Sequence, residues 1–214
     1  MKKITLHQVL PQVFAQRSDL ISDVWKTETC LEKGNAYLVE AESGKGKSTF
    51  CSYLLGYRHD YTGQIFFDQE DVSRFTISQW VNVRQQHISM LFQEMRLFPE
   101  LTAWENVEIK NRLTNHIPET TIKQWFTMLG IEEKLNVKVG ILSQGQQQRV
   151  AFIRTLVQPF DFLVIDEPIS HLDDGNAQLM ASIVSQMKEQ TGCGVIATSI
   201  GKRLPLQYDY TLKL

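Results

Sequence analysis

The chain has 214 residues, and its 22 Lys and Arg residues nearly balance 24 Asp and Glu residues, for a formal net charge of −2 at pH 7. This length suits one domain with a large core, and the balanced charge excludes the broad cationic surface that binds nucleic acid non-specifically, so we expect no nucleic acid partner. The three Cys residues form no C-x-x-C pair, which excludes a disulfide framework or zinc site and fits a reducing compartment.

The first third of the chain has the pattern of short strands. Apolar and polar residues alternate over residues 4–9, 20–27 and 63–68, and the last of these leads into a polar turn. An uninterrupted apolar run at residues 36–39 precedes a glycine-rich loop. We therefore expect an antiparallel sheet that packs beside a parallel one.

The glycine-rich loop at residues 41–49 has the pattern of a phosphate-binding loop. Gly44 and Gly46 let backbone N–H groups turn toward an anion, the following helix adds the positive end of its dipole, and Lys47 can reach the outer phosphates of a nucleotide. The hydroxyl of Ser48 is placed to hold Mg²⁺. Ala41 stands where the motif has glycine, which at a positive φ would cost about 1 kcal/mol. The alternative is a plain strand-to-helix turn of small residues.

The middle of the chain is predicted to be helical. Ile122, Trp125, Phe126 and Leu129 follow the i, i+3, i+4, i+7 spacing of a buried helix face, and Gly130 is a typical helix stop. We interpret this aromatic stripe as core rather than as a ligand site.

The run 142–149 is glutamine-rich and opens another predicted helix. Ser143 and Gln146 have the spacing of a capping box, which is a structural role. The turn itself has no apolar surface, however, and a bare helix N-terminus can bind an anion. Because the phosphate-binding loop lies on a different element, that anion could come from a second subunit.

Two adjacent carboxylates, Asp166 and Glu167, follow the apolar strand predicted at residues 162–165. A helix near residues 175–190 and a strand at residues 194–198 continue an alternation that indicates a parallel sheet. Ligands bind at the carboxyl ends of such strands, so Asp166 is predicted to bind Mg²⁺ and Glu167 to orient or deprotonate the water that attacks the γ-phosphate. A solvated strand end is the alternative.

Five motifs follow one another along the chain: the loop 41–49, Gln93 after Leu91-Phe92, the run 142–146, the Asp166-Glu167 pair, and residues 170–173. Their order and spacing resemble those of the nucleotide-binding subunit of ATP-binding cassette (ABC) transporters, and the resemblance covers essentially the whole chain. Residues 92–107 look most like ATPases of the lipoprotein-release, macrolide-export and cell-division branch.

The resemblance implies an α/β fold. We expect a P-loop NTPase core with a mostly parallel sheet and flanking helices, an N-terminal antiparallel β subdomain and an inserted α-helical subdomain. Residues 1–214 would form a single ABC ATPase domain, in which 1–93 and 143–214 make the nucleotide-binding core and 94–142 the helical subdomain.

The resemblance also implies roles for individual residues. The predicted catalytic residues are Glu167, Gln93 and Ser199, and the predicted Mg²⁺ ligands are Ser48, Gln93 and Asp166. The predicted nucleotide-binding residues are Ser43, Gly44, Lys45, Gly46, Lys47, Ser48, Thr49 and Phe14, with Phe14 placed either to stack on adenine or in the core. Ser143, Gln144, Gly145 and Gln146 would contact the phosphate held by a second subunit, and Ser170, His171, Leu172 and Asp173 would connect the two subunits.

The implied partners are a second nucleotide-binding subunit, with a homodimer expected, and a transmembrane permease. Two subunits would close head to tail around two molecules of ATP with Mg²⁺, and hydrolysis would open them. The stretch 95–98 suits either a permease's cytoplasmic helix or a buried hinge. The sequence shows neither an 18-residue apolar window nor the apolar core of a signal peptide, so we expect a cytoplasmic protein held at the inner face of the membrane by the permease.

Two departures from the family pattern bear on function. Gln144 replaces the first Gly of Leu-Ser-Gly-Gly-Gln, which leaves Ser143 and Gly145 in place. Ser199 stands where the family has a histidine that touches the γ-phosphate, and losing one transition-state contact can cost roughly 3 kcal/mol. Two functions are therefore open: an ATPase that powers a transporter, favoured by Glu167, and a weakly hydrolysing, ATP-gated regulatory or binding module, favoured by Ser199.

Overall fold

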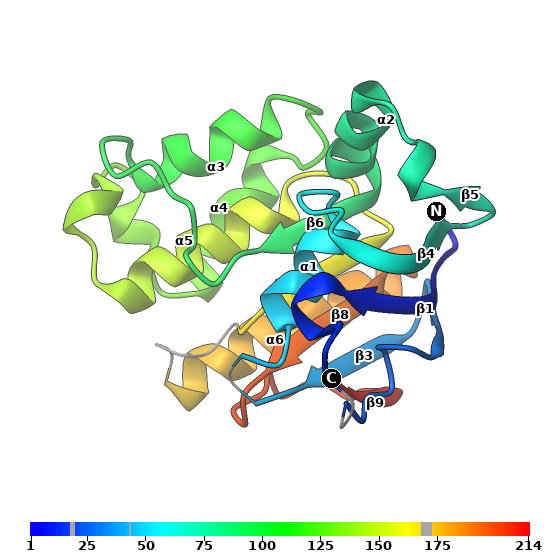
Figure 1. Ribbon diagram of the computed structural model, residues 1–214. Coiled ribbons are helices and arrows are strands. Elements are labelled where there is room, and N and C mark those ends of the chain that lie inside the picture. The colour runs from blue at the N-terminus through cyan, green and yellow to red at the C-terminus, as the bar shows by residue number, and fades with distance from the viewer. Residues whose placement is uncertain (18–19, 43, 168–172) are drawn as a thin grey trace.

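A computed structural model describes residues 1–17, 20–42, 44–167 and 173–214 of the chain (Figure 1). Its centre is a five-stranded sheet in the order β6-β7-β8-β3-β9, in which every neighbouring pair is parallel. The strands are β3 (Ala36–Glu40), β6 (Ile88–Leu91), β7 (Phe162–Asp166), β8 (Gly194–Ser199) and β9 (Tyr210–Lys213). Because β6, β7 and β8 are buried along their whole length, their apolar runs form the middle of the protein.

A second sheet is antiparallel and has the strand order β2-β1-β4-β5. Its strands are β1 (Lys3–Pro11), β2 (Glu28–Glu32), β4 (Tyr61–Phe67) and β5 (Glu70–Asp71). The register of β1 against β4 shifts after His7, where Gln8 has a φ of +50°. Gly63 faces this bulge, and a Cβ at that position would lie 2.3 Å from the Gln8 carbonyl oxygen, so only glycine fits.

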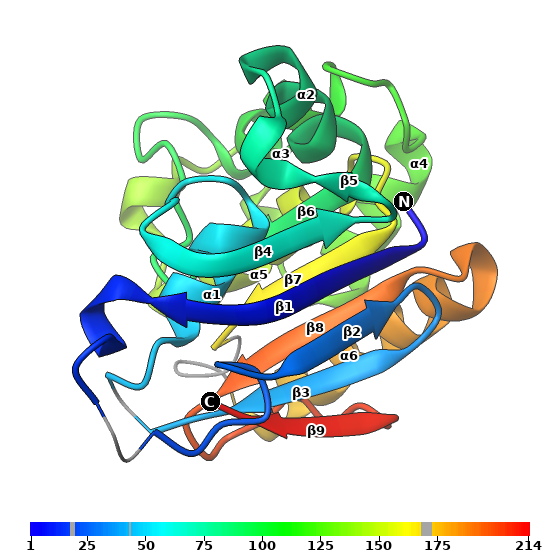
Figure 2. The ribbon, with the colours of Figure 1, turned by 45° about the vertical axis from the view of Figure 1, so that its right-hand side comes forward.

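Helices cover the parallel sheet, and the two faces of its strands point to different cores. Phe162, Val164 and Ile196 pack with the antiparallel sheet and α1 (Lys47–Leu54) on one face. Leu163 and Val195 pack on the other face, where α5 (Gln144–Leu156) and α6 (Asp174–Thr191) lie (Figure 2). The predicted pairing of an antiparallel sheet with a parallel one is confirmed.

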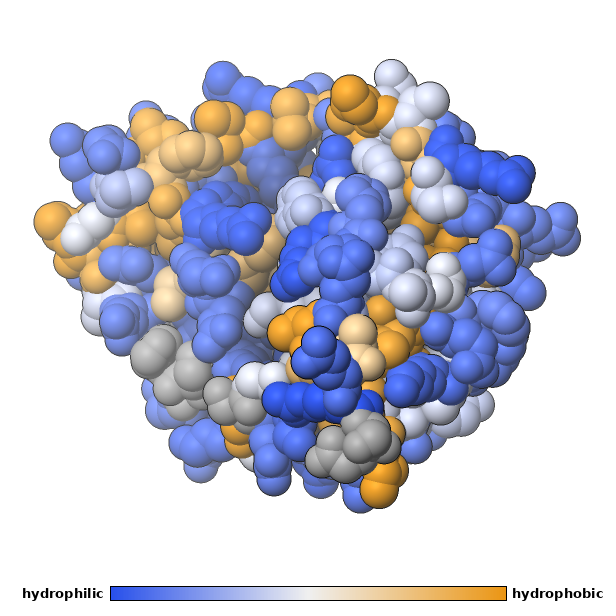
Figure 3. All heavy atoms as spheres, viewed as in Figure 1, coloured by the Kyte–Doolittle hydropathy of each residue, from blue (hydrophilic) through white to orange (hydrophobic). Residues whose placement is uncertain are grey.

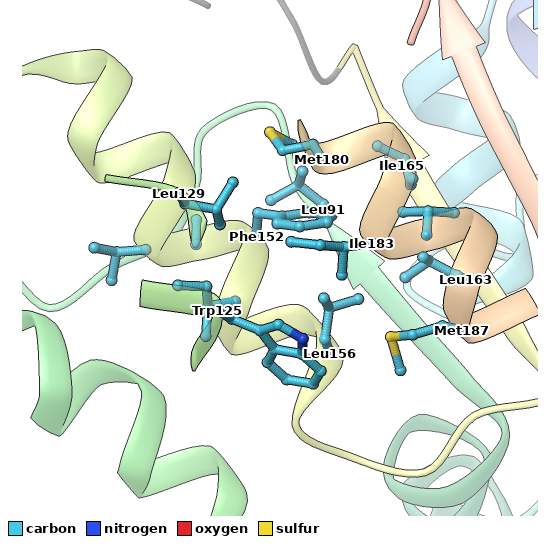
Figure 4. Close-up of a cluster of buried hydrophobic side chains, with 14 of the residues drawn as sticks. Leu91, Trp125, Leu129, Phe152, Leu156, Leu163, Ile165, Met180, Ile183 and Met187 are labelled. Carbon is cyan, nitrogen blue, oxygen red and sulfur yellow. The ribbon is translucent and has the colours of Figure 1, made fainter. Parts of the chain in front are cut away.

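The helical part lies beyond α5, away from β1 and β9 (Figure 1). Its elements are α3 (Ala103–Asn111), α4 (Glu119–Met128) and the short turns η4 (Glu132–Lys134) and η5 (Val139–Ile141). Trp125 and Leu129 of the predicted stripe are buried against Phe152 and Leu156 of α5 in the core drawn in Figure 4. Gly130 follows α4 with a φ of +62°, as a helix stop does.

Other segments departed from the expected pattern. Residues 20–27 form turns instead of a strand, because the Ser22 hydroxyl accepts hydrogen bonds from the backbone N–H groups of Val24 and Trp25, and Lys26 has a φ of +58°. The sequence analysis did not predict β9, nor the segment before β6. That segment comprises η2 (Val72–Arg74), α2 (Ile77–Asn82) and the π-helical turn η3 (Val83–His87). The expected boundaries of the helical subdomain at residues 94 and 142 stay a prediction.

Candidate functional site

The site forms where β3, β7 and β8 end side by side. In the parallel register Glu40 pairs with Ser199, and Asp166 pairs with Thr198. The backbone N–H of Ala41 continues this contact by donating to the Ser199 carbonyl oxygen at 3.2 Å. The loop after β3 therefore starts beside the ends of the other two strands, at the edge where parallel sheets bind ligands.

The loop turns into α1 at Gly46, which caps the helix in the left-handed conformation with a φ of 103°. A Cβ there would come within 2.9 Å of the Phe14 ring, so a larger residue does not fit. Ala41, by contrast, has no positive φ, and the alanine at this position carries none of the strain that the sequence suggested. Ser43 lies outside the described residues.

Lys47 points back over this loop and is only 5 % exposed. Its ammonium group donates hydrogen bonds to the carbonyl oxygens of Ala41 at 3.0 Å and Glu42 at 3.1 Å. The same Nζ atom lies 3.5 Å from a carboxylate oxygen of Glu167. The loop lysine and the carboxylate after β7, which lie 120 positions apart in the chain, therefore meet as an ion pair.

Glu167 is held in a strained backbone conformation. Its φ is +48°, which costs a non-glycine residue about 1 kcal/mol or more, and its backbone N–H donates to the Thr198 hydroxyl at 3.2 Å. The Gln93 side chain donates to the second carboxylate oxygen at 3.1 Å. The Thr198 contact holds the backbone of Glu167, and the Gln93 contact holds its carboxylate beside Lys47. Two of the predicted catalytic residues are therefore brought together.

Asp166, the last residue of β7, is almost completely buried. Burial raises its pKa above the ordinary value for an aspartate, and a hydrogen bond from the Thr198 hydroxyl at 2.5 Å opposes part of that rise, as does one from Ser48. Ser48, Asp166 and Gln93 present hydroxyl, carboxylate and amide oxygens. These are the hard ligands that Mg²⁺ takes together with nucleotide phosphates, so the donor set fits this ion.

A cavity of about 350 Å³ opens over these residues. Its lining includes most of the predicted nucleotide-binding and catalytic residues: Phe14, Gly44, Gly46, Lys47, Ser48, Thr49, Gln93 and Glu167. Lys45 lines a neighbouring cavity of about 480 Å³ instead. The arrangement can hold a chain of phosphates between Lys47, the backbone of the loop and the N-terminus of α1.

Three lining residues were missed by the sequence analysis: Val13, Arg58 and Ile200. Arg58 donates a hydrogen bond to the Thr49 hydroxyl at 3.2 Å and forms a bidentate salt bridge with the Asp60 carboxylate. No spacing rule connects a lone arginine after α1 to the loop before it. The only local signal is the Arg58-x-Asp60 pair, which is also typical of an ordinary surface turn.

Phe14 forms a wall of the cavity from within the core. Its side chain is 3 % exposed, packs over Gly46, and has the Arg17 guanidinium 5.1 Å from its ring centroid. Little ring surface is left for an adenine to stack on, so the core alternative fits the geometry better. Val13, which is 64 % exposed, offers more surface to a ligand.

Ser199 is the predicted catalytic residue that the structure does not bring to the cavity. Its side chain is 1 % exposed, and its hydroxyl donates to the Lys202 carbonyl oxygen at 2.7 Å and accepts from the Gly201 N–H at 3.0 Å. The neighbouring Ile200 reaches the cavity in its place. The serine therefore serves a tight turn, and the expected weak contact to a phosphate has no support in this geometry.

The glutamine-rich run forms the exposed N-terminus of α5. Ser143 caps the helix, and Gln146 completes the capping box, as predicted. None of the cavity-lining residues comes from the trans-contact set Ser143, Gln144, Gly145 and Gln146. This helix end therefore does not take part in the chain's own nucleotide cavity, and Ser143 and Gln144 are exposed to solvent.

Asp173 caps α6 by accepting from the Asn176 N–H at 2.8 Å. Arg149 of α5 donates both to Asn176 and, at 3.0 Å, to the Gly145 carbonyl oxygen, so the two helix ends are connected. The other predicted dimer residues, Ser170, His171 and Leu172, lie outside the described residues. Within the described residues no helix is long and apolar enough to span a bilayer.

Comparisons with known proteins agree with this arrangement. The family model described as "ABC transporter" matches residues 26–170. The ABC transporter ATP-binding protein YtrE of Bacillus subtilis is 30% identical over 163 residues, which cover 75% of this chain and 71% of that protein. The lipoprotein-releasing system ATP-binding protein LolD of Syntrophotalea carbinolica is 28% identical over 197 residues, 91% of this chain and 86% of that one.

Other relatives are longer. An uncharacterized ABC transporter ATP-binding protein of Mycobacterium tuberculosis is 29% identical over 176 residues, and the match spans 81% of this chain but only 53% of that protein. Among solved structures, the dimeric bacterial ABC transporter cassette MJ0796 superposes with a TM-score of 0.78 at 24% identity, over 92% of this chain and 87% of that one. This likeness confirms the predicted α/β fold.

Proposed function

Because the chain belongs to the ABC transporter family, we propose that it is an ATP-binding subunit that hydrolyses ATP to drive a membrane transporter. The observation that carries the proposal is the meeting of Lys47, Glu167 and Gln93 over the cavity at the carboxyl ends of β3 and β7. Phosphoryl transfer needs positioned charge more than covalent chemistry, and this cavity offers a cation, a carboxylate and a turned backbone.

The chain's own residues would act in a definite order. An incoming nucleotide would bring its phosphates to the Lys47 ammonium, which now rests on the carbonyl oxygens of Ala41 and Glu42. That contact would compete with the Lys47–Glu167 ion pair and release the Glu167 carboxylate. Glu167 would then orient the attacking water and accept its proton, with Gln93 holding the carboxylate in line.

Mg²⁺ would bind at Ser48, Asp166 and Gln93 together with the phosphates. When bound, the ion neutralises charge that develops on the phosphate oxygens. Asp166 is fixed for this by the Thr198 hydroxyl and by its place at the end of β7. The donor set contains oxygen atoms only, which favours Mg²⁺ over softer transition metals.

Two such subunits would act as a pair. The exposed N-terminus of α5, with Ser143 and Gly145, would close over the nucleotide of the other subunit, while Asp173 would lie near the shared interface. The similar bacterial cassette MJ0796 is dimeric, which supports this idea. We propose that the pair is a homodimer and that it binds a permease in the membrane, on the cytoplasmic face. The similarity to LolD supports a place near the lipoprotein-release branch.

The alternative function, a weakly hydrolysing regulatory module, is not favoured. It depended on Ser199, whose hydroxyl is turned away from the cavity into the 199–202 turn. Glu167, on which hydrolysis depends, does line the cavity.

The Lys47→Ala variant tests the nucleotide assignment. Removing the ammonium group is expected to weaken ATP binding about a hundredfold or more and to abolish hydrolysis, because charged hydrogen bonds to phosphate are lost. Isothermal titration with ATP in the presence of Mg²⁺ measures the affinity, and Lys123→Ala, which removes an exposed lysine of α4 far from the loop, is the matched control. Unchanged ATP affinity in Lys47→Ala would remove the basis of the proposal.

A further inference from the structure

Arg58 reaches the nucleotide cavity from the turn that follows α1. It lines the cavity together with Thr49 of that helix, and its guanidinium group donates to the Thr49 hydroxyl at 3.2 Å. None of the five motifs covers position 58, so the family resemblance implies no role for this arginine.

Asp60 holds the Arg58 side chain in one orientation. Its carboxylate accepts hydrogen bonds from Nε and from one Nη atom of the guanidinium group, which is the bidentate geometry of a strong arginine–carboxylate pair. The hydrogen bond from Arg58 lowers the pKa of Asp60, so both groups are charged at neutral pH. The planar guanidinium group is therefore fixed before a ligand arrives.

The turn that carries this pair is anchored to another part of the cavity wall. The Asp60 carbonyl oxygen accepts from the Tyr53 hydroxyl at 3.0 Å and from the Gln12 N–H at 2.9 Å. Gln12 begins η1 (Gln12–Phe14), whose last two residues also line the cavity. Arg58 and η1 are therefore connected parts of one wall.

The guanidinium group keeps N–H donors for a ligand. Among the described residues, the Arg58 side chain makes three hydrogen bonds, two to Asp60 and one to Thr49. These contacts do not use all of its donors. The side chain is 41 % exposed, so a ligand in the cavity can reach the others.

The position of Arg58 favours the inner phosphates of a nucleotide. Glu167 and Gln93 mark the place of the terminal phosphate, where hydrolysis would occur. Within the ranges that the structure describes, Arg58 forms no hydrogen bond or ion pair with either residue. At the other end of the ligand, Phe14 is buried and offers a base little surface. The phosphates between these two ends are the part within reach of Arg58 and Thr49.

The cavity differs from the hydrophobic surface of the helical part. Figure 3 shows hydrophobic residues gathered over α3 along the upper edge of this face, whereas the centre, where α1 lies in Figure 1, is largely hydrophilic. A fixed arginine in such surroundings favours an anionic ligand such as a phosphate over an apolar one.

We propose that Arg58, oriented by Asp60, binds the inner phosphates of the nucleotide together with Thr49. Arg58 would be a binding residue for ATP and ADP alike, and Asp60 a positioning residue. The inference rests on the proposed function, because the nucleotide supplies these phosphates. A contact that binds substrate and transition state equally lowers KM without raising kcat, so this arginine should act on KM.

The affinities of Arg58→Met for ATP and ADP test the inference. In a Glu167→Gln background, which slows turnover, Kd for each nucleotide should rise about tenfold, because each loses one charged hydrogen bond to a phosphate. Arg112→Met, which breaks an exposed pair with Glu108 at the end of α3, is the matched control and should leave both affinities unchanged. A loss confined to ATP would place Arg58 at the terminal phosphate and overturn the inference.

Sulfur substitution shows which part of the nucleotide Arg58 contacts. Sulfur is a weaker hydrogen-bond acceptor than oxygen. Of the ATP analogues with sulfur on the α- or β-phosphate, wild type should bind at least one diastereomer several-fold more weakly than ATP, and Arg58→Met should lose this discrimination. Equal discrimination by both proteins would mean that Arg58 only stabilises its turn. A loss in Arg58→Met that disappears with 2′-deoxyATP would assign the contact to the ribose and also overturn the inference.

Steady-state kinetics separate binding from chemistry. In Arg58→Met, KM for ATP should rise about tenfold, while kcat falls less than about threefold. Asp60→Asn should raise KM about threefold, because Arg58 keeps its charge but loses its fixed orientation. Arg58→Lys should lie between Arg58→Met and the wild type. A large fall in kcat at unchanged KM would contradict the inference.

The failure of this inference and that of the proposed function look different. Unchanged ATP and ADP affinities in Arg58→Met, measured beside weakened binding in Lys47→Ala, reject the Arg58 contact alone. A wild-type protein that binds neither ATP nor ADP rejects the proposed function, and the inference with it.

Discussion

Strand β7 has a carboxylate pair at its carboxyl end and a single carboxylate, Asp161, just before its amino end, and the two ends differ in their electrostatics. The Asp161 carboxylate accepts hydrogen bonds from the Met1 amine at 2.6 Å and from the Lys33 ammonium at 2.5 Å. It also forms a hydrogen bond with the His87 ring at 2.6 Å. Glu167 meets one lysine at 3.5 Å and faces a cavity. A carboxylate enclosed by cations stabilises the fold, whereas one aimed at open space is available for chemistry.

The pKa values at the two ends follow this difference. At the amino end burial raises the pKa of Asp161, but the hydrogen bonds from Lys33, the Met1 amine and His87 outweigh it and lower the value to about 2. At the other end burial raises the pKa of Asp166, and its hydrogen bonds do not compensate. Substitutions at the two ends should therefore separate stability from activity.

The largest effect is expected for Glu167→Gln. The amide keeps the shape and the contact with Gln93 but cannot accept a proton, so the steady-state rate of ATP hydrolysis should fall about a hundredfold or more. ATP affinity and the free energy of unfolding should change little, because loss of the ion pair with Lys47 is offset by relief of a partly buried charge. A rate within threefold of the wild type would assign the base elsewhere.

Asp161→Asn should have the opposite profile. At pH 7 the free energy of unfolding should fall by about 2 kcal/mol, as the shift of the pKa to about 2 implies, while turnover per folded molecule stays unchanged. Urea unfolding followed by circular dichroism measures the loss. Glu119→Gln, which breaks an exposed pair with Lys123 on α4, is the control and should cost less than about 0.5 kcal/mol.

The same pair of proteins gives a pH test. The pKa of Asp161 is lower in the folded state than its ordinary value near 4, so its contribution to stability is present above that pH and is lost as the pH falls toward 2. The stability difference between wild type and Asp161→Asn should therefore be constant from pH 7 to about pH 5 and shrink below pH 4. A difference that persists undiminished at pH 3 would show that the ion pairs are not its source.

Thr198→Val should affect both stability and metal binding, to a smaller degree. The Thr198 hydroxyl donates to Asp166 and accepts from the Glu167 N–H, so valine leaves two polar groups at the end of β7 without this partner. We expect a loss of about 1 to 2 kcal/mol in the free energy of unfolding and a several-fold higher Mg²⁺ requirement for hydrolysis. Unchanged Mg²⁺ dependence would mean that Asp166 needs no support from β8.

Site residues could be predicted from the sequence where they lie next to one another in a short motif. The loop with Lys47 and the Asp166-Glu167 pair each follow an apolar strand, and the parallel register alone brings them together. The Asp161 cluster could not be predicted, because the hydrogen-bond partners of this carboxylate come from positions 1, 33 and 87. Arg58 was not predicted as a cavity residue for the same reason. The strand predicted at residues 20–27 was wrong because alternation of apolar and polar residues does not show that the Ser22 hydroxyl stabilises a turn there.

The smallest effect is expected for Ser199→Ala, which tests whether the hydroxyl at the end of β8 has a structural or a catalytic role. The Ser199 hydroxyl holds the 199–202 turn through Lys202 and Gly201, so Ser199→Ala should cost about 1 kcal/mol of unfolding free energy and change the rate of hydrolysis less than about twofold. If Ser199→Ala instead lost ATP hydrolysis and kept normal stability, the hydroxyl would have to contact the phosphate of ATP. Ser199→His is the companion variant: a histidine does not fit the buried position, so it should destabilise the turn, and a gain in hydrolysis would mean that the end of β8 can rearrange to expose it.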